Sequence, residues 1–91
     1  MNKKEKYINY VVDDLVKNTE IDHDQETIKF PFYYNYILPS SPLPFPSILF
    51  YSHHSTTFSK HVIERYGVHD EEMRIIWNQY REKILTIIGN G

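Results

Sequence analysis

The middle of the chain constrains its fold more than any other feature, because no Asp, Glu, Lys or Arg occurs from Phe30 to Ser59. This segment contains all five prolines of the chain and is dense in aromatic residues. Repeated prolines favour extended backbone and oppose helix, whereas so many aromatic rings are foreign to a solvated, disordered linker. We therefore expect an irregular proline- and aromatic-rich middle segment whose rings are buried somewhere, either against the helices or at an interface with a partner.

Apolar residues recur with helical spacing on both sides of this segment. The recurrence predicts one amphipathic helix over about residues 3–17 and another over about residues 70–88. A shorter helix over about residues 57–66 is expected to begin at a run of hydroxyl residues. Asn18 fits the left-handed position that follows the first helix, and Gly67 fits the one that follows the shorter helix.

A chain of 91 residues is long enough for one small domain. After the first helix, Ile21 and Ile28 flank a polar turn, which is compatible with a short β-hairpin over about residues 19–30. The expected fold is a single domain, residues 1–91, that is mainly α, with three helices, this hairpin and the irregular middle segment. The chain lacks cysteine, which excludes disulfides and thiolate metal sites.

The charge and hydropathy of the chain give no general attraction to nucleic acid or to a membrane. The formal net charge is −2, and no segment approaches the roughly 20 apolar residues that span a bilayer. We therefore expect a soluble, cytoplasmic protein. The chain has no alanine and is rich in Ile, Lys, Asn, Tyr and Phe, which indicates an AT-rich gene of the kind that many phages carry.

The residues needed for catalysis or for holding a cofactor do not form a recognisable set. With only three glycines, the chain has no glycine-rich phosphate loop. Serines and histidines adjoin one another in residues 52–55, but sequence neighbours rarely adopt the geometry of a nucleophile and its base. The five histidines lack the spacing of a metal site. We expect a non-enzymatic protein with no cofactor and no metal site.

Two helices joined at Gly67 raise the alternative of a helix-turn-helix regulator that binds nucleic acid. In that alternative, Arg65 and Arg74 contact phosphate. The acidic residues 70–72 argue against it, because they begin the helix that would face the polyanion. The apolar positions on either side of the turn are equally expected of any two helices that pack together.

Apolar surface is the strongest remaining indication of function. Tyr10 lies on the polar face of the first helix, and Ile75 lies opposite the apolar stripe of the last helix. Uncharged aromatic and aliphatic residues of this kind are typical of the centres of protein interfaces. We expect a protein–protein interaction module that binds another protein or self-associates. Its expected contact residues are Tyr10, Tyr33, Tyr34, Tyr36 and Ile75.

The C-terminal sequence FSKHVIERYGVHDEEMRIIWNQYREKI, residues 58–84, resembles the C-termini of small uncharacterised proteins from tailed phages of marine bacteria. The stretches VVDDLVKNTEID and IKFPF add to this resemblance. The resemblance implies a phage-encoded protein that works in the host cytoplasm. It carries no activity or site residue with it, because no function is assigned to those proteins.

Overall fold

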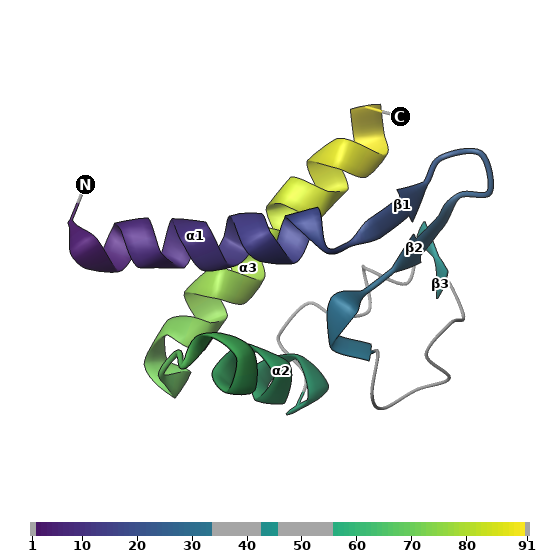
Figure 1. The fold of residues 1–91 in the computed structure, drawn as a ribbon. Coiled ribbons are helices and arrows are strands. Elements are labelled where there is room, and N and C mark those ends of the chain that lie inside the picture. The colour runs from purple at the N-terminus through teal and green to yellow at the C-terminus, as the bar shows by residue number, and fades with distance from the viewer. Residues whose placement is uncertain (1, 34–42, 46–55, 91) are drawn as a thin grey trace.

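Three helices and a small sheet form the fold in the computed structural model, which describes residues 2–33, 43–45 and 56–90 (Figure 1). The helices are α1 (Lys3–Lys17), α2 (Thr56–Tyr66) and α3 (Asp70–Asn90). The predicted three-helix, mainly α fold is confirmed, with helix boundaries that differ from the prediction by at most two residues. In Figure 1, α1 and α3 cross each other, and α2 lies beside the N-terminal half of α3.

The predicted hairpin is also confirmed. Strand β1 (Glu20–Asp22) pairs antiparallel with β2 (Thr27–Lys29), and Ile21 lies opposite Ile28. The short strand β3 (Leu43–Pro44) adds to the other edge of β2, which gives the sheet order β1-β2-β3. The sequence did not predict this third strand, because proline cannot donate to a strand ladder and is tolerated mainly at sheet edges.

Side-chain hydrogen bonds shape the turn of the hairpin. The Asp22 carboxylate accepts from the backbone N–H groups of Asp24 and Gln25, each at 3.0 Å. Such a local bond is typical of aspartate in turns. Glu26 has a positive φ of 55°, and its carbonyl accepts from the N–H of Phe45 at 2.9 Å. The turn is therefore fixed both from within and by the segment that carries β3.

The ends of α1 and α2 are closed by recognisable capping interactions, one of which differs from the expectation. Asn2 caps α1 by accepting from the N–H of Glu5 at 2.8 Å. Gly67 has a left-handed φ of 68°, and its N–H donates to the Ile63 carbonyl at 2.9 Å. The left-handed conformation expected at Asn18 is wrong, since its φ is −91°. Its side-chain amide instead donates to a carbonyl of the last turn of α1 at 2.8 Å.

The core lies between α1, α2, α3 and residues 28–32, and aromatic rings fill its centre. Phe32, in the 3₁₀-helix η1 (Pro31–Tyr33), makes an edge contact with Phe58 of α2 at a centroid distance of 5.1 Å. Phe58 in turn contacts Trp77 of α3 at 4.9 Å. Phe30, Phe32 and Phe58 all belong to the uncharged stretch and are all buried, so the expectation that its rings are buried is confirmed for these three.

A hydrogen-bond chain ties α3 to the end of α1. The Tyr80 hydroxyl lies 2.7 Å from the Thr19 hydroxyl, which donates to the Leu15 carbonyl at 2.7 Å. Burial raises the pKa of Tyr80, and the bond with Thr19 lowers it by less. Tyr80 therefore remains a neutral hydroxyl inside the core, with its polar atom paired.

Candidate protein interface

The structure places two of the five expected contact residues at the surface. Tyr10 is 59% exposed and Ile75 is 43% exposed, so neither belongs to the core. Tyr33 lies in η1, but its side chain, like the whole of Tyr34 and Tyr36, lies outside the described residues. Among the described residues, the exposed large hydrophobic side chains are Tyr7, Tyr10, Ile63 and Ile75.

Tyr10 belongs to a cluster between α1 and α2 that is centred on Tyr66. The Tyr66 hydroxyl donates to Asp14 Oδ2 at 2.6 Å. Arg65 Nε lies 3.6 Å from the same oxygen, and the Arg65 guanidinium lies 5.7 Å from the centroid of the Tyr66 ring. Tyr10 meets this ring edge-on at 6.3 Å, and the Tyr7 hydroxyl donates to the Tyr66 carbonyl. We call these five residues the seam cluster.

The electrostatics of the seam cluster keep Tyr66 a hydrogen-bond donor. Partial burial raises the pKa of Tyr66, and its bond to Asp14 raises it further, against a smaller opposite effect of Arg65. His61 lies edge-on to the Tyr66 ring at 6.5 Å. Burial lowers the pKa of His61, with a further lowering by the charge of Arg65. At neutral pH the seam cluster therefore holds a neutral phenol at Tyr66 and an internally paired Asp14–Arg65 couple, and the imidazole of His61 beside it is neutral.

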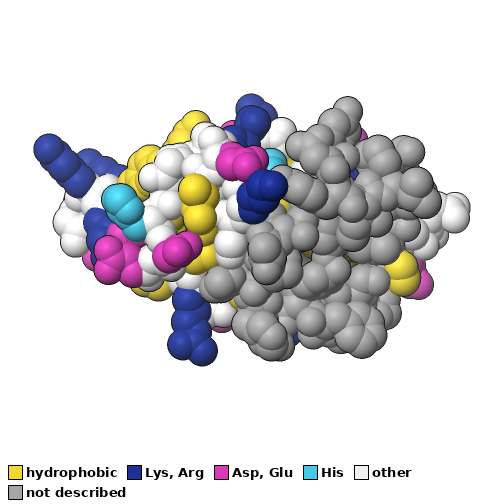
Figure 2. Space-filling view, turned by 90° about the horizontal axis from the view of Figure 1, so that it is seen from below, with side chains coloured by type: hydrophobic (Ala, Val, Ile, Leu, Met, Phe, Trp, Pro, Cys, Tyr) yellow, Lys and Arg dark blue, Asp and Glu magenta, His cyan; other side chains and the backbone are white. Residues whose placement is uncertain are grey.

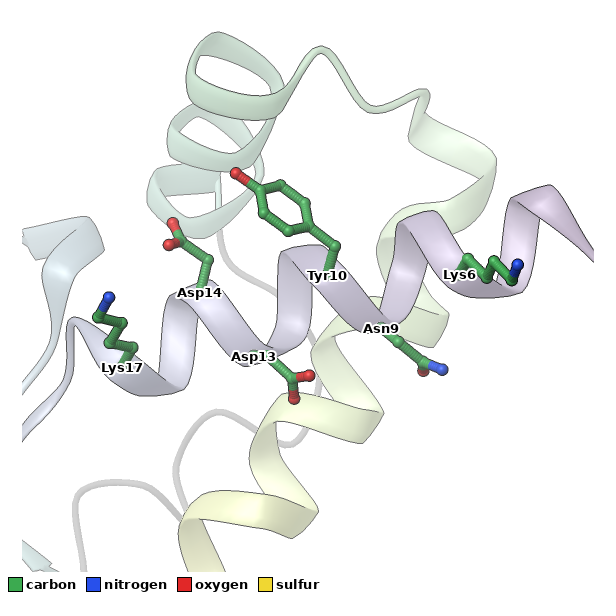
Figure 3. A pocket seen from close by; sticks show the side chains of 6 residues that line it. All are labelled: Lys6, Asn9, Tyr10, Asp13, Asp14 and Lys17. Carbon is green, nitrogen blue, oxygen red and sulfur yellow. The ribbon is translucent and has the colours of Figure 1, made fainter. Parts of the chain in front are cut away.

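An open hollow of about 480 Å³ lies on the outer face of α1 (Figure 3). Tyr10 and Asp14 point to one side of the helix axis, whereas Asn9 and Asp13 point to the other. Asp13 accepts from Lys83 of α3 at 2.7 Å, so α3 closes that side. The residues that line the hollow are Lys6, Asn9, Tyr10, Asp13, Asp14 and Lys17.

Ile75 borders a second hollow, of about 470 Å³, between α1 and α3. Ile8 and Gln79 lie beside it, and Asn9 lines both hollows. Tyr10 and Ile75 therefore lie in two neighbouring hollows, one on each side of α1, and do not form one continuous apolar patch. Figure 2 likewise shows hydrophobic side chains in small patches bordered by acidic and basic ones, on the face seen in that view.

The two arginines of the nucleic-acid alternative lie in different settings. Arg65 of α2 is held by Asp14, so a phosphate contact would compete with an existing ion pair. Arg74 of α3 is exposed. Asp70 and Glu71, at the acidic start of α3, are exposed. A recognition helix would bring these acids close to the phosphates of DNA, which is unfavourable.

The sequence did not predict that Tyr7 and Tyr66 contribute to this surface. The partner of Tyr66, Asp14, lies 52 residues away in the chain. A hydroxyl-bearing ring next to an arginine at a helix end was the available signal.

Within the described residues, no group of three or more His, Cys, Asp or Glu side chains is placed to hold a metal ion.

Comparison with known proteins adds no relative to this picture. No family model matches the chain, and neither a curated protein nor a solved structure matches it. Within the part of the chain that is described, no helix is long and apolar enough to cross a membrane. The interpretation of the surface therefore rests on the geometry of α1, α2 and α3.

Proposed function

We propose that this protein is a small non-enzymatic protein–protein interaction module whose contact surface comprises the outer face of α1 and the adjoining face of α3. The observation that supports the proposal most is the exposure of Tyr10 and Ile75 beside a core that is already filled by other residues. Tyrosine contributes a rigid ring and a hydroxyl, and such residues are enriched where proteins meet.

The charged groups around these two side chains support the same proposal. Lys4 pairs with Glu72 at 3.6 Å next to the Ile75 hollow, and Lys83 pairs with Asp13 next to the Tyr10 hollow. Apolar side chains within a polar rim are the usual anatomy of a transient interface.

The proposed partner is a host protein, encountered in the host cytoplasm by a phage-encoded chain. The resemblance of residues 58–84 to phage proteins supports this choice. Self-association into an oligomer is the second form of the same proposal, because the same exposed side chains would be covered by another copy.

The test is capture from a bacterial lysate with the tagged protein, with and without nuclease, followed by sizing of the eluate. We expect a protein partner in a fixed ratio that survives nuclease and is lost with Ile75→Asp. Asn78→Asp is the matched control, because it places the same charge at an exposed position of the same helix. This control should keep the partner.

Two outcomes contradict the proposal. Capture that is equally strong with Ile75→Asp and the wild type would remove Ile75 from the contact surface. Recovery that vanishes with nuclease, with affinity that falls steeply as salt rises, would favour the helix-turn-helix alternative with Arg65 and Arg74 at phosphates. Sizing of the protein alone separates self-association from binding to another protein.

A further inference from the structure

In the hollow on α1, the acidic side chains form ion pairs with described residues and the lysines do not. Asp13 is paired with Lys83, and Asp14 is paired with Arg65 and with the hydroxyl of Tyr66. Lys6 and Lys17 are exposed, and neither forms an ion pair with any described residue. The fold thus pairs both carboxylates of the hollow with cationic side chains and leaves both of its ammonium groups able to bind an anionic group from outside the described residues.

The two lysines stand at opposite ends of the hollow, with an aromatic ring between them (Figure 3). They are eleven residues apart in the sequence, which corresponds to about 16 Å along a helix axis. Tyr10 lies one turn after Lys6 and about two turns before Lys17. An extended peptide covers about 16 Å with about five residues, so one short segment reaches both ends.

We propose that this hollow binds an acidic peptide segment of a partner protein, with carboxylates at Lys6 and Lys17 and an apolar side chain against Tyr10. This inference rests on the proposed function and specifies the chemistry of the partner. One oxygen of each aspartate, Asp13 Oδ2 and Asp14 Oδ1, has no hydrogen bond within the described residues. These oxygens are available to accept N–H groups of the peptide backbone.

The same charges disfavour the other occupants. A second α1 helix laid on this face would bring its own lysines against Lys6 or Lys17, and the negative charges of Asp13 and Asp14 are already offset by Lys83 and Arg65. A nucleic-acid backbone would place phosphates beside Asp13 and Asp14, which offer no donor to them. An acidic peptide meets the lysines with opposite charge and the aspartates with N–H groups.

The experiment uses a fluorescein-labelled synthetic peptide of about eight residues, with two glutamates at each end and a leucine in the middle, so that the inner glutamates lie about five residues, or about 16 Å, apart and reach both lysines. Its binding to the full chain is measured by fluorescence polarisation at low and high salt. We expect saturable binding that weakens with salt. The variant Lys6→Glu/Lys17→Glu should weaken it about tenfold, since each exposed pair contributes roughly threefold.

Two controls make the result specific. The variant Lys29→Glu/Arg74→Glu changes the net charge equally outside the hollow and should bind as the wild type does. A peptide with glutamine in place of glutamate should not bind. Circular dichroism confirms that the Lys6 and Lys17 variant retains its helices.

Three results would overturn the inference: no binding of the acidic peptide, equal weakening by both double variants, or a dimer of the chain alone that Lys6→Glu/Lys17→Glu dissociates. Its failure is distinct from failure of the proposed function. If the lysate partner is still captured by Lys6→Glu/Lys17→Glu and lost with Ile75→Asp, the interaction module stands and the acidic-peptide site does not.

Discussion

Two adjacent isoleucines of α3 allow a sharp test of where the core ends. Ile75 is 43% exposed, whereas Ile76 is 0% exposed. Aspartate at Ile76 removes about 1.5–3 kcal/mol of burial and places a carboxylate among apolar side chains at a cost of several kcal/mol more. The sum approaches the whole stability of a small domain, about 5–15 kcal/mol, so we expect Ile76→Asp to be unfolded.

Aspartate at Ile75 should cost far less. Because nearly half of this side chain is already in water, only about 1 kcal/mol of burial is lost. With a urea dependence of about 1 kcal/mol per M, the unfolding midpoint should fall by about 1 M. Fluorescence of Trp77 reports the transition, because it is the single tryptophan of the chain and is fully buried.

The same assay can refute the reasoning. A folded Ile76→Asp with a midpoint near that of the wild type would mean that Ile76 does not face the core. An unfolded Ile75→Asp would place Ile75 in the core, and loss of partner capture by that variant could then not be assigned to a contact.

Three further predictions concern single side chains outside this pair. Gly67→Ala should destabilise the fold by about 1 kcal/mol because of its left-handed φ, whereas Gly89→Ala, within α3 and with open space around the added methyl, should be neutral or stabilising by up to about 1 kcal/mol; urea unfolding of both variants checks this. Tyr66→Phe should lower the free energy of unfolding by about 1 kcal/mol, because the carboxylate of Asp14 loses its hydroxyl donor. In the same assay, Tyr10→Phe should change the free energy of unfolding by no more than about 0.5 kcal/mol. The raised pKa of Tyr80 favours its neutral form in the folded state, so its contribution is complete below about pH 10. Above that pH, unfolding should become easier by about 1.4 kcal/mol per pH unit, and alkaline titration of Tyr80→Phe should show a shallower fall.

The helices were predictable because each carries its own signal in the sequence. The period of the apolar residues in α1 and α3 follows from one face being buried, and Gly67 marks a backbone conformation that other residues avoid. The strand Leu43–Pro44 was not predictable, because its pairing depends on β2 and not on its own residues.

The candidate surface was only partly predictable, for a related reason. Exposure of Tyr10 and Ile75 follows from their helical phase. The bond between Asp14 and Tyr66 depends on how two distant helices approach each other, and no local pattern encodes that approach. Which lysines are left without a partner depends on the same tertiary contacts, so the acidic-peptide site became visible only in the folded chain.

The packing of α1 against α3 also has a consequence for synthesis of the chain. The apolar stripe of α1 is made well before the helix that covers it, which runs from Asp70 to Asn90. Throughout elongation, α1 presents Ile8, Val11, Val12 and Leu15 with no α3 to receive them. The α1–α3 core therefore forms only after α3 has emerged, and the nascent chain is open to chaperones and to aggregation until then.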